Sequence, residues 1–156
     1  MTNNNLSDEF SMIIHHLSGC ARYSLQELNL GENQINGTLP DLSTFSALKS
    51  LHLSRNRLNG KITEDIKFPS QLGLLSISSN FLEGGISKSF GNACALRTLD
   101  MTNNSLTDDF SMIIHHLSGC ARYSLQELNL GENQINGTLP DLSAFSALKS
   151  LDLSRN

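Results

Sequence analysis

The amino-acid sequence predicts an α/β repeat solenoid that has a parallel β-sheet on its concave face and short helices or turns on its convex side. The pattern L-x-x-L-x-L-x-x-N, with Leu, Ile or Met at its apolar positions, begins at residues 25, 48, 72, 96, 125 and 148. Within each copy, apolar and polar residues alternate with the period of a strand that buries one face. Successive copies start 23, 24, 24, 29 and 23 residues apart. Such regular spacing is typical of stacked structural units, so we expect one strand of a common sheet from each copy.

Residues 1–156 are predicted to form a single solenoid. A partial repeat at 1–24 is followed by repeats that start at residues 25, 48, 72, 96 and 125, and by a partial repeat at 148–156. Residues 1–56 recur as residues 101–156, and the two copies differ only at Asn5/Ser105, Ser7/Thr107, Glu9/Asp109, Thr44/Ala144 and His52/Asp152. The period of 100 residues is a whole number of small repeats. The duplication therefore lengthens the solenoid without disturbing the contacts between neighbouring repeats.

A short helix is predicted at residues 11–17, where Ile13, Ile14 and Leu17 fall on one helical face. Gly19 follows as a plausible helix stop. The same segment recurs at residues 112–117, ahead of Gly119, and it accounts for the longest spacing between copies, 29 residues. We expect the helix to lie on the convex side.

The apolar residues of each predicted strand should point inward, because alternate side chains of a strand face opposite sides. The residues between them should face outward. The expected inner wall consists of Leu28, Leu30, Leu51, Leu53, Leu75, Ile77, Leu99, Met101, Leu128, Leu130, Leu151 and Leu153.

An asparagine ends each copy, at the point where the chain turns away from its strand. Backbone N–H and C=O groups lose their sheet partners at such a turn, and a buried amide offers both donors and an acceptor to satisfy them. We expect these side chains to form a structural ladder from one repeat to the next. They are Asn4, Asn33, Asn56, Asn80, Asn104, Asn133 and Asn156.

The repeated pattern L-x-x-L-x-L-x-x-N-x-L is the leucine-rich-repeat signature. Its continuation, N-x-L-x-G-x-I/L-P, resembles the plant-specific repeat of cell-surface receptor-like proteins and receptor kinases, as in NQINGTLP, NRLNGKIT and NFLEGGIS. The stretch LSGCARYSLQELNLGENQINGTLPDLSTFSALKSLHLS resembles the ectodomains of plant receptor-like proteins of the fungal ethylene-inducing-xylanase receptor type. The resemblance covers the whole chain.

This resemblance implies an extracellular, curved solenoid at the plasma membrane. It also implies a protein, peptide or glycan ligand, a co-receptor as a further candidate partner, and a role in defence or developmental signalling. Several features of the family are not found in the sequence: a signal peptide, a cysteine-capped N-terminal domain, a transmembrane helix and a kinase motif. We therefore interpret the chain as a fragment of such an ectodomain or as a truncated gene product.

The outward-facing residues of the strands and of the turns after them are the candidate ligand-binding residues, because solenoids of this kind bind on their concave face. The alternative is an ordinary solvated sheet face. Phe81, an apolar residue among polar ones, is the best single candidate for an anchor. The set comprises Glu27, Asn29, Glu32, Ser50, His52, Arg55, Ser76, Ser79, Phe81, Thr98, Asp100, Asn103, Glu127, Asn129, Glu132, Ser150, Asp152 and Arg155.

Two kinds of residue carry possible covalent modifications. Sequons for N-glycosylation occur at Asn5, Asn36, Asn103 and Asn136, and a glycan on Asn103 would obstruct the expected concave face. Cys20, Cys94 and Cys120 precede strands, where small apolar side chains could fill the core. The alternative for Cys94 and Cys120, which belong to successive repeats, is a disulfide between them.

The sequence predicts no enzyme, no metal site and no cofactor. Adjacent histidines at 15–16 and 115–116 would point about 100° apart on a helix and would chelate poorly, and no Cys/His set has zinc spacing. The carboxylate pairs at 8–9 and 108–109 stand at a turn or helix start, where negative charge is favoured. No serine lies in a G-x-S-x-G motif.

Charge and hydropathy exclude further classes. The net charge is −4 and the basic residues are scattered, whereas nucleic-acid binding needs a clustered basic face. No stretch approaches the roughly 18 consecutive apolar residues of a membrane span.

Three hypotheses of function remain. The first is a ligand-recognition module. The second is a soluble protein resembling the polygalacturonase inhibitors, which share this repeat; it would require a secretion signal and capping cysteines. The third is a duplicated remnant without activity of its own. Because a solenoid needs polar capping repeats for solubility, we also expect the isolated chain to self-associate through its ends.

Overall fold

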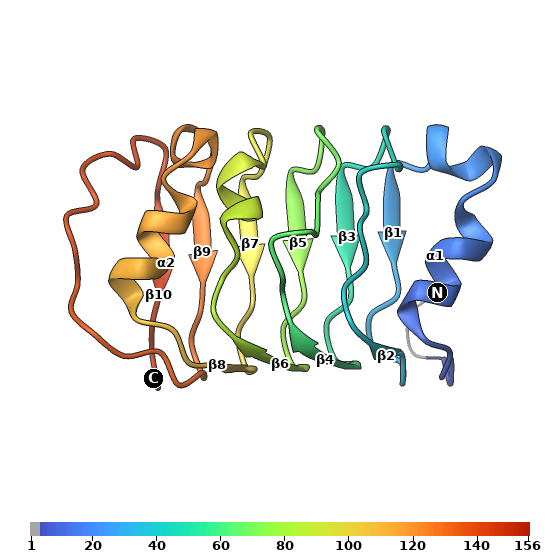
Figure 1. Ribbon diagram of the computed structural model, residues 1–156, viewed down its shortest axis with the longest axis horizontal. Helices are drawn as coiled ribbons and strands as arrows, with labels where there is room; N and C mark the ends of the chain where they lie inside the picture. Colours follow the sequence, from blue (N-terminus) through green and yellow to red (C-terminus); the bar gives the residue numbers. More distant parts are fainter. Residues whose placement is uncertain (1–3) are drawn as a thin grey trace.

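The computed structural model describes residues 4–156, and the predicted fold class is confirmed. Six parallel strands form one sheet in the order β1-β3-β5-β7-β9-β10 (Figure 1). Each strand pairs in register with the next, so that Glu27 lies beside Ser50 and Leu28 beside Leu51. The strands are β1 (Glu27–Asn29), β3 (Ser50–His52), β5 (Leu74–Ser76), β7 (Thr98–Asp100), β9 (Glu127–Asn129) and β10 (Ser150–Asp152).

A second parallel sheet, which the sequence analysis did not predict, follows the turns after these strands. Its order is β2-β4-β6-β8, and it runs along the lower edge of the solenoid in Figure 1. Isolated bridges from Glu9 to Asn36 and from Asp109 to Asn136 add to this pairing. The strands are β2 (Asn36–Gly37), β4 (Arg57–Lys61), β6 (Phe81–Gly84) and β8 (Ser105–Leu106).

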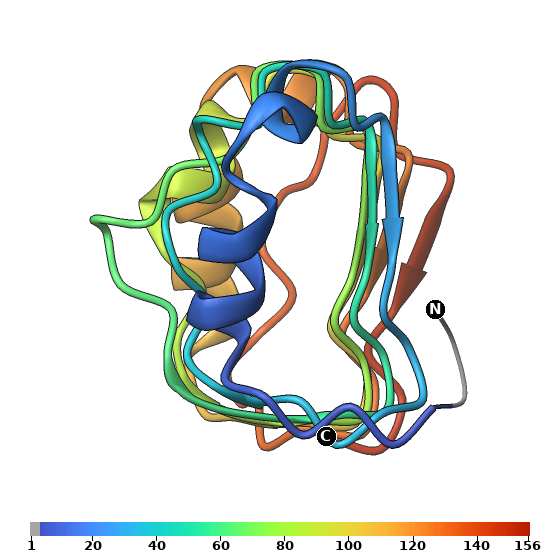
Figure 2. The same ribbon diagram turned by 90° about the vertical axis from the view of Figure 1, so that its right-hand side faces the viewer.

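The helices lie across the core from the six-stranded sheet (Figure 2), on the convex side as predicted. Both α-helices begin at a phenylalanine, one residue before the predicted segment in the first copy and two before it in the second. Figure 2 shows them facing the strands. The helical segments are α1 (Phe10–Leu17), η1 (Cys20–Tyr23), η2 (Lys88–Asn92), α2 (Phe110–Leu117) and η3 (Cys120–Tyr123), where η denotes a 3-10 helix.

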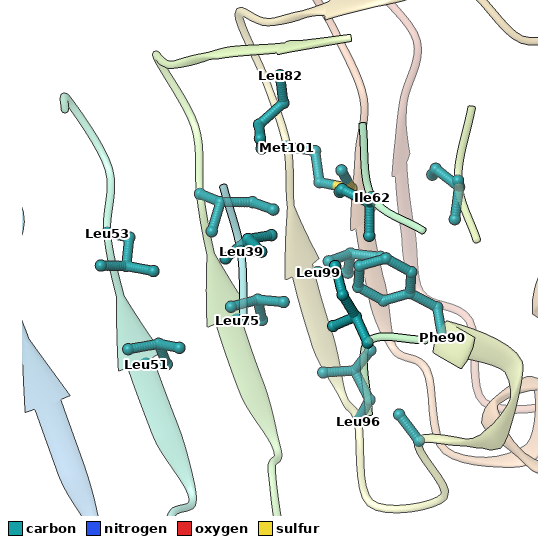
Figure 3. Close-up of a cluster of buried hydrophobic side chains, with 14 of the residues drawn as sticks. Leu39, Leu51, Leu53, Ile62, Leu75, Leu82, Phe90, Leu96, Leu99 and Met101 are labelled. Carbon is teal, nitrogen blue, oxygen red and sulfur yellow. The ribbon is translucent and has the colours of Figure 1, made fainter. Parts of the chain in front are cut away.

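The core lies between the sheet and the convex segments. All predicted inner-wall residues from Leu28 to Leu130 are buried, and Leu151 and Leu153 of the last repeat are half-buried. Figure 3 shows side chains of neighbouring strands, including Leu75 and Leu99, in one cluster with Phe90 of η2. The alternation of leucines thus sets which face of each strand meets the convex segments.

The asparagine side chains connect the repeats by hydrogen bonds. Asn80 Oδ1 accepts from the backbone N–H of Leu58 at 3.0 Å, and Asn80 Nδ2 donates to Leu53 O at 3.0 Å and to Ile77 O at 3.1 Å. The same three kinds of bond are made by Asn56, Asn104, Asn133 and Asn156.

Burial of the ladder asparagines differs from repeat to repeat. Asn33 is buried, and its Oδ1 accepts from the N–H of Leu6 at 3.2 Å. Asn104 is half-buried, whereas Asn4 and Asn156 are exposed. The amides of Asn33, Asn56, Asn80 and Asn133 are therefore shielded from water, which makes their hydrogen bonds the hardest to replace.

The cysteines do not fill the core, so that expectation was wrong. Cys94 and Cys120 form a disulfide with their Cα atoms 4.9 Å apart, as the alternative proposed. Cys94 and the free Cys20 are exposed, and Cys120 is half-buried. The convex segments that carry Cys94 and Cys120 pack side by side in successive repeats. The two sulfur atoms therefore meet outside the core.

We expect Asn80→Leu to lower the free energy of unfolding by about 1–3 kcal/mol, the cost of leaving a buried polar group unpaired. The groups in question are the N–H of Leu58 and the carbonyl of Leu53, which the leucine could not satisfy. Urea unfolding measures the change. Asn156→Leu is the matched control and should cost less, because Asn156 is exposed and water can replace the amide. Equal costs at the two positions would contradict this account.

The disulfide predicts one free thiol in the denatured chain without reductant and three after reduction. Cys120→Ser should lower the free energy of unfolding by about 2–4 kcal/mol, because the bridge closes a loop in the unfolded chain. Cys20→Ser, at an exposed unpaired cysteine, should leave it unchanged. Thiol titration that finds three free thiols under both conditions would rule the bridge out.

Candidate functional site

The concave face of the six-stranded sheet displays two outward rows of side chains from its strands. Because the strands are parallel and in register, equivalent residues of successive repeats stand in line. The first row is Glu27, Ser50, Leu74, Thr98, Glu127 and Ser150, and the second is Asn29, His52, Ser76, Asp100, Asn129 and Asp152. A polar hollow lies over the second row at Ser76, Asp100, Asn129 and Asp152, and it continues beyond the strand ends along Ser54, Ser78 and Thr102.

Hydrogen bonds between neighbouring side chains order the two rows. Ser76 Oγ donates to Asp100 Oδ2 at 3.2 Å, from one strand to the next. Within β3, Ser50 Oγ and His52 Nε2 are 3.0 Å apart. Asn29 Oδ1 accepts from the N–H of Gly31 at 3.1 Å, which fixes that amide over the end of β1. The polar groups are therefore positioned before any ligand arrives.

A third row stands at the turn just before the ladder asparagines, and all its members have a positive φ. The angles are 57° for Glu32, 56° for Arg55, 54° for Ser79, 55° for Asn103, 54° for Glu132 and 58° for Arg155. Residues other than glycine rarely adopt this left-handed conformation, although asparagine tolerates it best. The ladder asparagine that follows each of these residues fixes the backbone through the hydrogen bonds of its amide. Each turn therefore holds the side chain of the left-handed residue at the rim of the concave face.

Charges on the concave face are only partly compensated. Arg55 Nη1 lies 3.3 Å from Glu32 Oε1, and Arg155 Nη1 lies 2.9 Å from Glu132 Oε1. The side chains of both pairs are well exposed, so each pair contributes little to stability. Four carboxylates among the described residues of this face have no ion-pair partner: Glu27, Asp100, Glu127 and Asp152. The face is therefore acidic.

Asp152 stays ionised well into the acidic range. The backbone N–H of Ser154 donates to it at 2.9 Å. This bond lowers the pKa of the Asp152 carboxyl, with further help from the Ser154 hydroxyl and the nearby Arg155. Its negative charge is thus a fixed part of the surface at neutral pH.

Two positions differ from the sequence-based expectation. Phe81 is exposed, but it belongs to β6 of the second sheet and not to the concave strands. Its predicted place on the concave face was wrong, because the chain turns at Ser79 and Asn80 before reaching it. Leu74 was missed: it aligns with Ser50 and Thr98 in the first row and is half-buried. The consecutive leucines 74 and 75 were the signal, since only one of them can face the core.

The sequons lie at or near the second sheet. Asn136 is exposed, and its backbone pairs with that of Asp109 in an isolated β-bridge. Asn36 is half-buried, and its Nδ2 donates to Ser7 O at 3.0 Å. Asn5 is exposed and accepts a hydrogen bond from Gln34. Asn103 is exposed in the left-handed row and donates to Ser79 Oγ at 3.2 Å. Asn136 therefore offers the least encumbered amide for a glycan.

Within residues 4–156, no three His, Cys, Asp or Glu side chains are grouped so as to hold a metal ion. His15 and His16 are both exposed, and their ring centroids are 6.1 Å apart with tilted planes. Over the same residues, no helix has the length and apolar character needed to cross a bilayer.

Comparison with known proteins identifies the repeat. The family model described as Leucine Rich Repeat matches residues 24–44, 47–68, 95–120 and 124–145. The chain belongs to the leucine-rich-repeat family. Each of these matches begins one residue before one of the copies recognised in the sequence, those that start at residues 25, 48, 96 and 125.

Individual relatives are plant receptors. The chain is 37% identical over 117 residues to receptor-like protein EIX2 of Solanum lycopersicum, an alignment that covers 74% of this chain and 11% of the relative. It is 32% identical over 157 residues to receptor-like protein 32 of Arabidopsis thaliana, covering 99% of this chain and 17% of the relative. The resemblance to plant receptor-like proteins is thereby confirmed, and the leucine-rich-repeat chain spans less than a fifth of either relative.

A solved structure supports the same assignment. The ectodomain of the Arabidopsis receptor kinase HAESA, in complex with an N-terminally extended IDA peptide hormone ligand, superposes with a TM-score of 0.82 at 31% identity. The match covers 99% of this chain and 25% of that chain.

The left-handed row yields a stability prediction. Ser79→Gly should raise the free energy of unfolding by up to about 1 kcal/mol, because glycine adopts a positive φ without steric cost. Ser78→Gly, one residue earlier and without a positive φ, should lower it by about 0.5–1 kcal/mol through chain entropy. Chemical denaturation of the two variants measures the difference. Destabilisation of equal size at both positions would show that the positive φ of Ser79 has no steric cost.

Proposed function

We propose that the concave face of this leucine-rich-repeat chain recognises an extended peptide, as part of a plant cell-surface receptor-like ectodomain in defence or developmental signalling. The observation that carries the proposal is the polar hollow that residues of β5, β7, β9 and β10 form with the turns after the strands, on a face whose six strands are in register. Receptors of the same repeat type support it, since the HAESA ectodomain was solved with a peptide hormone. The activity is binding rather than catalysis, and the location is the extracellular side of the plasma membrane.

The charge of the face favours a basic ligand. Glu27, Asp100, Glu127 and Asp152 are not ion-paired within the described chain, whereas both arginines of the face are already paired with glutamates. Potentials of opposite sign steer association and suppress partners of the wrong charge. A peptide with lysine or arginine side chains would complete the pairing at Asp100 and Glu127, which stand on adjacent strands.

Leu74 is the proposed apolar anchor in place of Phe81. It stands in the middle of the first row, between the hydroxyl side chains of Ser50 and Thr98. An apolar residue surrounded by polar ones is the arrangement in which a binding surface concentrates its energy. A ligand with one apolar side chain between basic residues would satisfy the face best.

A co-receptor is the second proposed partner. HAESA has also been solved with the peptide hormone IDA together with the co-receptor SERK1; that match has a TM-score of 0.76 at 31% identity and covers 93% of this chain and 24% of HAESA. Glycans on Asn5, Asn36 or Asn136 would stand near the second sheet and leave the strand rows of the concave face open. A glycan on Asn103, at the rim, would narrow the access to the concave face.

Selection from a displayed library of random 12-residue peptides against the full chain tests the proposal. The selected peptides should be enriched in lysine and arginine. Leu74→Ser should weaken their binding by about ten-fold, the loss expected for one poorly buried leucine. Asp100→Asn should weaken peptide binding more at low salt than at high salt, because salt already screens the attraction that the substitution removes. Biolayer interferometry on the purified variants measures both changes.

Asp65→Asn is the matched control for charge, because Asp65 is exposed and lies outside both sheets. It should leave the affinity unchanged. A library that yields no enriched peptide, or peptides that bind the Leu74 and Asp100 variants as tightly as the parent chain, would refute recognition on this face. That result would favour a duplicated remnant without activity.

A further inference from the structure

His52 is the histidine of the concave rows, and its twin in the duplicated sequence is an aspartate. The two copies of this strand and its turn read LKSLHLSRN and LKSLDLSRN. Each pairs with the same asparagine of the preceding strand, Asn29 beside His52 and Asn129 beside Asp152. Of the differences between the two copies, this is the only one that replaces one kind of ionisable side chain by another. The duplication therefore changes the charge of the face at a single position.

The imidazole of His52 stands at the edge of the polar hollow, on an interior strand. In Figure 1, β3 lies between β1 and β5. His52 is in register with Ser76 of β5, which lines the hollow, and Ser54 in the turn after β3 lines it as well. The residue is half-buried. Part of it is therefore accessible to a ligand that enters the hollow.

The hydrogen bond between His52 and Ser50 is compatible with both charge states of the imidazole. Ser50 Oγ and His52 Nε2 are 3.0 Å apart. A neutral imidazole nitrogen can accept from the hydroxyl, and a protonated one donates to it, because a hydroxyl both donates and accepts. The side chain can therefore change its charge without leaving its place on the strand.

The surroundings of His52 make its protonation a large part of the charge at this end of the face. The side chains in register beside it, Asn29 and Ser76, are uncharged. The three rows contribute two glutamates and one arginine at the β1–β3 end, so this end has one net negative charge while His52 is neutral and none once it is protonated. The charged residues that the rows place around His52 are Glu27, Glu32 and Arg55 at this end, and Asp100 two strands away.

We propose that His52 is a specificity-determining residue of the concave face: in its neutral form it admits a basic side chain of the ligand at the β1–β3 end, and in its protonated form it excludes one. The inference rests on the proposed recognition of a basic peptide by the same face. Histidine gains its charge as the pH falls from about 8 to about 5. Like charges that face each other across an interface weaken a complex. The affinity for a basic peptide therefore falls as the pH is lowered through this range, and the basic residues of the ligand are left to the carboxylates of β7, β9 and β10.

The test measures the affinity of one selected peptide at two pH values. The peptide comes from the library selection, contains lysine or arginine, and has blocked ends and no histidine, aspartate or glutamate, so that its own charge is constant. Between about pH 7.5 and about pH 5.5 the full chain should lose affinity about five-fold, the effect of one unit charge that solvent and salt partly screen. Biolayer interferometry measures the dissociation constant at each pH.

Two substitutions at position 52 separate the charge of the imidazole from its place in the sheet. His52→Gln retains a polar side chain that does not titrate, and it should bind the peptide equally at both pH values. His52→Asp reproduces the residue that the same strand carries in the second copy, and it should bind more tightly than the parent chain at the lower pH. His115→Gln is the matched control, because His115 is exposed on α2, across the core from the sheet. It should keep the pH dependence of the parent chain.

The outcomes distinguish this inference from the proposed function. Peptides that bind the parent chain equally at both pH values would overturn the role of His52 and leave recognition on the concave face standing. A pH dependence that persists in His52→Gln would do the same, since another group would then be titrating. Failure of every peptide to bind at either pH would refute recognition on this face, and the role of His52 with it.

Discussion

Hydrogen bonds from the ladder asparagines hold one coil of this solenoid to the next. At each turn the chain leaves the six-stranded sheet, and the N–H and carbonyl groups of two successive repeats would face the core without partners. Asn80 satisfies the N–H of Leu58 with its oxygen and the carbonyls of Leu53 and Ile77 with its nitrogen. Among side chains of this size and neutral charge, only an amide offers donors and an acceptor together at this reach. The leucines fill the core, but the amides set the register in which the leucines of successive repeats meet.

That register also orders the concave face, which we propose binds the ligand. Once neighbouring strands are in line, the outward side chains stand in rows about 4.8 Å apart, and bonds such as that from Ser76 to Asp100 fix their orientation. The turn that presents the ladder amide also places the preceding residue in the left-handed region, so its side chain stands at the rim. A single constraint, the turn around the amide, thus determines both the packing beneath the sheet and the polar groups above it.

The sequence predicted the features that follow from periodicity and missed those that depend on the neighbouring repeat. The strands, the inner wall and the convex helices follow from apolar spacing alone. The second sheet does not, because β2 and β4 contain asparagine and glycine, which have low strand propensity and pair only where a neighbouring repeat supplies the partner. Leu74 was missed because the apolar pattern admits either of two adjacent leucines. The disulfide stayed one of two alternatives because no spacing rule places convex segments side by side.

The internal duplication shows which positions these constraints leave free. None of the five positions that differ between residues 1–56 and 101–156 is buried in either copy. A difference in the core would have to be accommodated by both adjacent repeats, whereas a surface residue has few partners to satisfy. Only one difference, His52 to Asp152, falls in the outward rows of the concave face. It adds a carboxylate to the β9–β10 end of the face, beside Asn129 and two strands from Asp100. The two ends of the face therefore share a backbone and differ in charge, so the duplicated surface no longer presents two equivalent sites.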